Sequence, residues 1–149
     1  VKDINLMKKK YLKWILVYIW MAVIFIFSNQ PAQISNEKNK LVIYLFKMLG
    51  LDLNSMFGDL TNFIVRKAAH FTEYLILSLM LYNSLRESSA RKKALYFTIL
   101  YVFIYACTDE FHQIFVPGRE GRFRDVVIDT SGGSFALALV YFYNKVFKK

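Results

Sequence analysis

The chain has a single cysteine, no internal repeat and no low-complexity segment. Cys107 has no partner for an intrachain disulfide and lies in an apolar stretch, so we expect it to be a packing residue. The first apolar run is also not followed by a signal-peptide cleavage site. After the first apolar run, residues 27–31 read Phe-Ser-Asn-Gln-Pro, which does not resemble the small-residue site of a secretory signal. We therefore expect that run to be retained as a membrane span.

Apolar residues make up 56% of the 149 residues, which is above the roughly 45–50% of an ordinary soluble domain. They are gathered into four stretches that approach the about 20 residues needed to cross a bilayer. These stretches are residues 11–27, 68–85, 94–116 and 126–147. The pattern predicts an all-α, polytopic membrane protein: a bundle of four transmembrane helices in a single domain over residues 1–149.

Basic residues outnumber acidic ones by 20 to 11, and the net charge is +9. Nucleic acid is not the expected partner, because the basic residues lie between apolar spans. Twelve of the 20 lie in residues 2–13, 86–93 and 145–149. The positive-inside rule then places both termini and the central connection in the cytoplasm. Residues 28–62 and 117–124 are expected to face outward from the membrane.

The long outer connection contains an apolar run that is too short to span the bilayer. Residues 41–49 precede Gly50, which favours a helix stop. We expect a short helix here that lies at the membrane interface. Residues 51–62 are expected to be a loop, with a turn at residues 57–59.

Polar side chains gather at the outer ends of three predicted spans. Arg66, His70 and Glu73 are spaced i, i+4 and i+7, so they share one helix face, with Lys67 beside it. Ionisable groups at this depth are costly in a membrane and often mark a functional site.

The third span ends in the sequence Asp-Glu-Phe-His-Gln, in which Asp109, His112 and Gln113 share a face at i, i+3 and i+4. Glu110 is expected to point to the side, toward a different neighbour. His70 with Glu73, and Asp109 with His112, each form a pair of a histidine and a carboxylate one turn apart.

The outer loop and the start of the fourth span add three arginines and two carboxylates. A turn at residues 117–118, Pro-Gly, is compatible with antiparallel neighbouring helices. The carboxylates at the start of the fourth span suit the positive end of a helix dipole, and the small residues after them allow close helix packing. The residues concerned are Arg119, Arg122, Arg124, Asp125, Asp129, Gly132, Gly133 and Ala136.

In the order of these motifs the sequence resembles the VanZ-like family, which is named for a teicoplanin-resistance accessory protein. The resemblance rests on residues 67–74 (KAAHFTEY), 109–113 (DEFHQ), 116–119 (VPGR) and 125–133 (DVVIDTSGG). It implies an integral bacterial membrane protein, linked in some members to glycopeptide and lipoglycopeptide resistance. The family name implies no molecular mechanism. Where this chain has Asp129, the family often has asparagine.

Two sets of candidate site residues follow. An anion-binding role is assigned to the residues that could grip a phosphate or carboxylate and to their partners: Arg66, Lys67, Gln113, Arg119, Arg122, Asp125 and Asp129. A catalytic, proton-transferring role is assigned to His112, Asp109, His70 and Glu73. No metal ligand is assigned, because the chain has no recognised metal motif, although each histidine–carboxylate pair leaves a divalent-metal site open.

Plainer interpretations compete with both sets. The arginines could be a solvated loop that touches lipid headgroups, and the buried polar residues could form a hydrogen-bonded network that holds the helices together. Asp125 and Asp129 could serve as helix-capping groups paired with the loop arginines.

Three classes of function remain open. The favoured one is a cell-envelope protein whose outward site binds an anionic amphiphile. Candidate ligands are a phospholipid, a polyprenyl-phosphate carrier, a lipid-linked cell-wall intermediate or a lipoglycopeptide. The alternative is a membrane-embedded hydrolase or transferase that acts on a lipid-linked phosphate, so enzymatic activity stays undecided, as do any cofactors. A transporter would require an oligomer, since four helices leave little room for a pathway.

Overall fold

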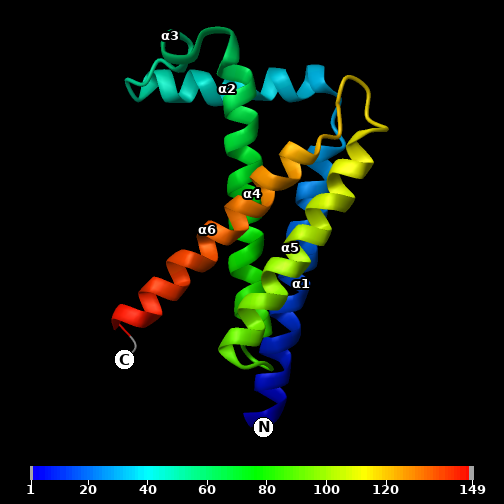
Figure 1. Ribbon diagram of the computed structural model, residues 1–149, viewed down its shortest axis with the longest axis vertical. Coiled ribbons are helices and arrows are strands. Elements are labelled where there is room, and N and C mark those ends of the chain that lie inside the picture. The colour runs from blue at the N-terminus through cyan, green and yellow to red at the C-terminus, as the bar shows by residue number, and fades with distance from the viewer. Residues whose placement is uncertain (1, 148–149) are drawn as a thin grey trace.

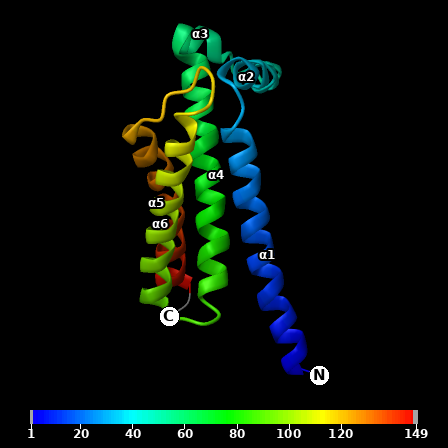
Figure 2. The same cartoon turned by 90° about the vertical axis from the view of Figure 1, so that its right-hand side faces the viewer.

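The computed structural model describes residues 2–147, and these residues form helices and connecting turns only. The elements are α1 (Lys2–Ser28), α2 (Ala32–Met48), α3 (Leu53–Phe57), the 3-10 helix η1 (Gly58–Leu60), α4 (Thr61–Leu85), α5 (Arg91–Gln113) and α6 (Phe123–Phe147). The long helices α1, α4 and α5 run along the long axis of the molecule, α6 crosses α4 at an angle and diverges from α1 toward its C-terminal end, and α2 crosses one end of them (Figures 1 and 2). The prediction of an all-α bundle is confirmed.

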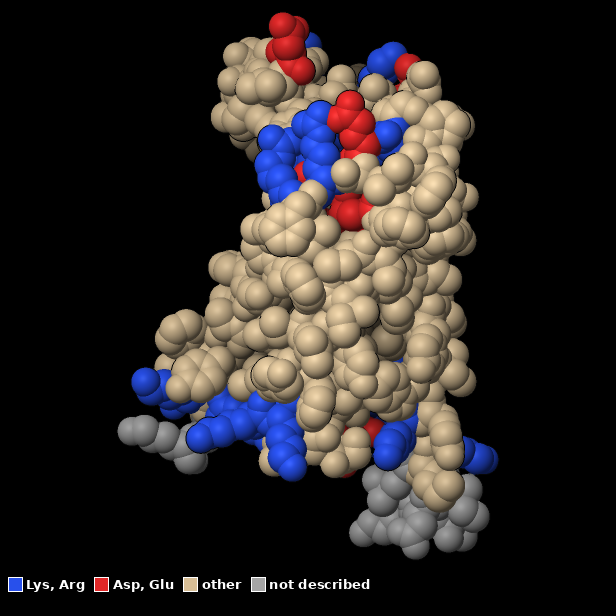
Figure 3. All heavy atoms as spheres, turned by 45° about the vertical axis from the view of Figure 1, so that its right-hand side comes forward, with Lys and Arg blue, Asp and Glu red and all other residues tan. Residues whose placement is uncertain are grey.

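Three helices are by themselves long and apolar enough to cross a membrane: α1 from Met7, α5 and α6. The fourth, α4, meets this criterion together with α2, from which it is bent by 108°. It packs against α1, α5 and α6, and its polar side chains His70, Ser78 and Ser84 are buried in the bundle. On the face shown in Figure 3, a band without charged residues separates two charged ends. The protein is therefore a helical membrane protein.

Both ends of the described chain lie at the end of the bundle opposite to α2, α3 and the α5–α6 connection (Figure 1). The prediction that this end is cytoplasmic stays a prediction. Lys148 and Lys149, which contribute to it, lie outside the described residues.

The first outer connection is more helical than the sequence predicted. The expected short helix over residues 41–49 is part of the longer α2, which begins directly after Pro31. The loop expected over residues 51–62 is wrong, since α3, η1 and the start of α4 occupy it. A local cap explains α3: the side chain of Asp52 accepts hydrogen bonds from the backbone N–H groups of Asn54 and Ser55 at 3.1 and 3.3 Å.

The helices α4 and α6 approach each other closely at two consecutive glycines. A Cβ atom on Gly132 would collide with the backbone of Phe71 on α4. The side chain of Ser78 on α4 donates to the carbonyl oxygen of Gly133 at 2.9 Å. The prediction that small residues of α6 allow close packing is confirmed, and this approach brings the polar ends of α4 and α6 together.

Candidate functional site

A cavity of about 220 Å³ opens where the ends of α4, α5 and α6 meet the α5–α6 connection. Charged side chains of both signs gather at this end of the molecule (Figure 3). The cavity is lined by Phe63, Arg66, Lys67, Gln113, Gly118, Arg119, Glu120, Arg122, Arg124 and Asp125. Every member of the predicted anion-binding set except Asp129 is among these lining residues.

Ion pairs already occupy part of this charged lining. Lys67 binds Asp125 at 2.6 Å, and both side chains are largely buried. Arg122 forms an ion pair with Glu120 at the exposed rim. Arg66 differs, because its Nε atom is buried and has no hydrogen-bond partner among the residues that the structure describes. The geometry thus leaves Arg66 with a donor available to a ligand.

Arg119 has a structural contact that its sequence position does not reveal. Its Nε atom donates to the carbonyl oxygen of Gln30 at 2.9 Å, and Nη2 donates to that of Phe27 at 3.3 Å. Carbonyl groups at a helix C-terminus have no partner within the helix, and a cation there is favourable. Arg119 therefore ties the α5–α6 connection to the end of α1 while it lines the cavity.

We expect Arg119→Ala to lower stability as well as any ligand affinity. Loss of two charge-assisted hydrogen bonds to backbone carbonyls should cost about 2–3 kcal/mol. The free energy of unfolding in detergent, compared with Arg122→Ala, measures this effect. Arg122 has its side-chain ion pair at the exposed rim, so its removal should cost under about 1 kcal/mol. Equal losses in the two variants would contradict a tethering role for Arg119.

Buried carboxyl groups lie beneath the cavity. Gln113 donates to Oδ2 of Asp109 at 3.3 Å and to Oε1 of Glu110 at 3.2 Å. Oε2 of Glu110 accepts from the backbone N–H of Arg122 at 3.0 Å. Gln113 is thus a link between the two carboxyl groups, and Glu110 holds the connection in place. The sequence pattern predicted that Glu110 faces a different neighbour, although its spacing of three residues from Gln113 is a signal for this contact.

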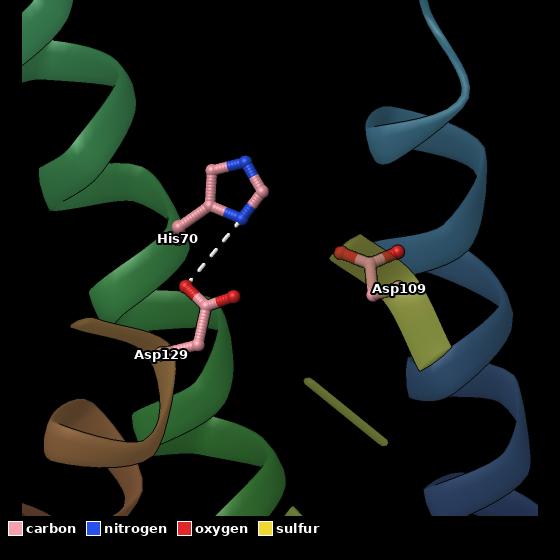
Figure 4. Close-up of side chains that lie close together, drawn as sticks. All are labelled: His70, Asp109 and Asp129. Carbon is pink, nitrogen blue, oxygen red and sulfur yellow. Dashed lines mark ion pairs between the residues drawn. The ribbon is translucent and has the colours of Figure 1, made fainter. Parts of the chain in front are cut away.

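His70, Asp109 and Asp129 come together from three helices, α4, α5 and α6 (Figure 4). Nδ1 of His70 lies 3.7 Å from Oδ1 of Asp129, and a ligand-type atom of each of the three residues lies within 4.8 Å of the others. Glu73 is close as well, with Oε2 4.0 Å from Nδ1 of His70. The arrangement combines one imidazole and carboxylates in a buried space.

His112 lies apart from this cluster. Its Nε2 is 3.0 Å from Oδ1 of Asn29, and its ring packs on Phe25 with centroids 4.6 Å apart. Phe25 lies in the last turn of α1 and Asn29 directly follows α1, so His112 makes contacts across helices that its spacing from Asp109 did not predict. Spacing along one helix could not reveal this, since it contains no information about α1.

Two residues that line the cavity, Phe63 and Glu120, were not predicted from the sequence. Phe63 precedes Arg66 and Lys67 by one turn on the same helix face, which is a usable signal. Glu120 carries no such signal, because it lies in an irregular connection whose path depends on tertiary contacts. Arg124 also lines the cavity, as its place in the outer loop suggests.

A family model described as VanZ/LLP1 matches residues 13–144. That range contains α4, α5, every residue of the site, and most of α1 and α6. Neither the curated proteins nor the solved structures include a match to the chain. Because the matched range covers most of the sequence and the resemblance of the motifs points the same way, the chain belongs to the VanZ/LLP1 family.

Proposed function

We propose that this protein binds the anionic head of an amphiphile in the cavity, at the outer face of a bacterial cytoplasmic membrane. The ligand class is a phospholipid or a lipid-linked phosphate of the cell envelope. A lipoglycopeptide is a further member of the class, given the resistance role after which VanZ is named.

The observation that carries the proposal is the surplus of positive charge in the cavity. Five cationic side chains line it, from Arg66, Lys67, Arg119, Arg122 and Arg124, against the carboxylates of Glu120 and Asp125. Both carboxylates are already bound to one of these cations. An anion is the partner that such a lining favours, and guanidinium groups suit phosphate oxygens bidentately.

The electrostatics at Arg119 support an anionic ligand. Burial lowers the pKa of the Arg119 guanidinium from its ordinary value, and the charge of Arg66 lowers it further. Guanidinium groups nevertheless remain protonated in proteins, so two like charges stay close to each other. A phosphate between them would offset this repulsion.

The size and surroundings of the cavity fit a headgroup rather than a whole lipid. Its volume of about 220 Å³ is below the roughly 300–1,000 Å³ of pockets that enclose drug-sized ligands. Phe63 lines the cavity, and Phe123, which starts α6 beside the arginines, is highly exposed. An acyl or prenyl chain could therefore lie in the surrounding bilayer while the head occupies the cavity.

Lipid retention tests the proposal. Purified protein is placed in nanodiscs of phosphatidylcholine with phosphatidylglycerol, and the lipids that remain bound after gentle extraction are measured by native mass spectrometry. Arg66→Gln removes a cation whose Nε has no partner and should reduce retained phosphatidylglycerol about tenfold, as expected for losing a charged hydrogen bond. Lys92→Gln makes the same change of charge at an exposed position and should have no effect.

A polyprenyl phosphate is tested in the same way. The proposal would be contradicted if the wild-type protein retained neither phosphatidylglycerol nor the polyprenyl phosphate better than phosphatidylcholine. Equal retention by Arg66→Gln and wild type would place the anionic head elsewhere.

The second candidate is a hydrolase or transferase that acts on a lipid-linked phosphate. It is favoured by the cluster of His70, Asp109 and Asp129, which lies deeper than the cavity on the same three helices. If the protein is such an enzyme, His70→Asn should abolish the release of phosphate from a polyprenyl diphosphate and leave binding of the polyprenyl diphosphate intact. Binding without turnover in the wild type would favour the first candidate.

A further inference from the structure

We propose that His70, Asp109 and Asp129 form a binding site for one divalent transition-metal ion, with Zn²⁺ as the best-suited member of the class. The inference stands apart from the proposed lipid binding, because it uses residues that do not line the cavity.

The three residues lie at the same depth relative to the cavity, each on its own helix. Each lies four residues from a residue that lines the cavity: His70 from Arg66 on α4, Asp109 from Gln113 on α5, and Asp129 from Asp125 on α6. Four residues are about one helical turn, or roughly 6 Å along the helix axis. The bundle therefore has two layers, an outer one that lines the cavity and a deeper one in which the three potential ligands face one another (Figure 4).

The second observation that supports a metal site is that polar atoms of the three residues are buried and have no hydrogen-bond partner. The exposed fractions are 7% for His70, 2% for Asp109 and 1% for Asp129. Within residues 2–147, Nδ1 of His70, Oδ1 of Asp109 and both carboxylate oxygens of Asp129 are buried and have no hydrogen-bond partner. Buried polar atoms are normally satisfied, and leaving them unpaired is costly. A metal ion would satisfy these atoms at once.

The two carboxylates of the cluster favour a cation of charge +2, while Arg66 and Arg119 act on the cluster from the layer above and oppose it. Neither Asp109 nor Asp129 forms an ion pair with a lysine or arginine in the described part of the chain. The basic group that could approach Asp129, that of Lys67, is bound to Asp125. Two buried carboxylates without a cationic partner are unfavourable in a membrane, and a divalent ion offsets both charges.

The ligand types and spacing select the metal class. An imidazole nitrogen favours Zn²⁺ and related ions over Mg²⁺ and Ca²⁺, which prefer oxygen ligands. Tetrahedral zinc with bonds of about 2.0–2.2 Å holds its ligand atoms about 3.3–3.6 Å apart. Nδ1 of His70 and Oδ1 of Asp129 are 3.7 Å apart, and the ligand atoms of all three residues lie within 4.8 Å of one another. Binding therefore requires the side chains to close by up to about 1.5 Å.

Three protein ligands leave a coordination position open, which is typical of zinc sites that bind water or substrate. Oε2 of Glu73 lies 4.0 Å from Nδ1 of His70 but outside the group of three, so Glu73 borders the site without being one of its ligands. An anion in the cavity would lie about one helical turn away from the ion. The site thus offers a physical reason for the cavity and the buried cluster to occur together.

Zinc titration tests the inference. Purified protein in detergent is treated with a chelator, dialysed and titrated with Zn²⁺ by isothermal calorimetry, and metal content is checked by mass spectrometry of the digested sample. The wild type should bind one equivalent. His70→Asn and Asp129→Asn should each weaken binding more than about 100-fold, since removal of even supporting groups outside the ligand set costs 10–100-fold.

Asp59→Asn is the matched control, because it makes the same change as Asp129→Asn at an exposed residue of η1. It should keep wild-type zinc affinity, and helical circular dichroism and gel filtration check that every variant is folded. Absence of zinc binding in the wild type, or equal binding by wild type and both cluster variants, would overturn the inference. A loss of equal size in Asp59→Asn would overturn it as well. In each of these cases the lipid-retention result stands on its own.

Discussion

Alanine in place of Gly132 is expected to destabilise the protein by about 3 kcal/mol or more, the upper range for forced overpacking. The added Cβ would collide with the carbonyl oxygen of Phe71 and would lie 3.0 and 3.1 Å from the carbonyl carbon and Cα of the same residue. These are backbone atoms of α4, so no side-chain rotation relieves the contact. The helices must separate, which also disturbs His70 and Asp129 on either side of the contact.

Thermal melting in detergent measures the effect of Gly132→Ala. For a chain of this size the expected fall in Tm is about 6–12 °C. Ala138→Val is the control: it adds volume to the same helix at an exposed position and should change Tm by less than about 2 °C. A Tm for Gly132→Ala within that margin of wild type would contradict the close approach of α4 and α6.

The substitution Lys67→Met is expected to cost about 3–5 kcal/mol, because it leaves the buried carboxylate of Asp125 without its cation. Arg124 also approaches Asp125, at 3.8 Å, but its side chain is mostly exposed and compensates only in part. The loss should appear as a lower free energy of unfolding.

A double-mutant cycle separates the ion pair from other effects of Lys67→Met. Asp125→Asn in that background removes the uncompensated charge and should recover about half of the lost stability or more. The exposed ion pair between Lys40 and Glu37 serves as a control and should show a coupling below about 0.5 kcal/mol. Additive effects at Lys67 and Asp125 would show that the pair does not stabilise the fold.

The stacked layers change how the family motifs are interpreted. The sequence pattern placed an anion-binding set and a catalytic set at the same outer helix ends. The structure separates a cation-rich cavity, which includes Arg66, from the deeper histidine–carboxylate cluster around Asp129. It also gives Arg119 a tether to the end of α1. A variant of Arg119 therefore reports on both folding and binding, whereas Arg66 and His70 test the two layers separately.

The sequence by itself determined the helical membrane fold and the members of the polar cluster. Apolar runs near bilayer length can satisfy their backbone groups only as helices, so the bundle follows from composition and spacing. Charged groups such as Arg66 and Asp129 stand out in such helices because their burial is costly. Small residues of α6, including Gly132, likewise indicate a close helix contact through their spacing alone.

Only the tertiary structure decided which groups meet. Periodicity shows which side chains share a face of one helix, and on that basis Asp109 was paired with His112 and His70 with Glu73. It says nothing about the rotation or depth of the neighbouring helix. The approach of α4 and α6 at Gly132 places His70 beside Asp129, and contacts with α1 turn His112 toward Asn29. Those arrangements depend on packing between segments far apart in the chain, which local spacing does not encode.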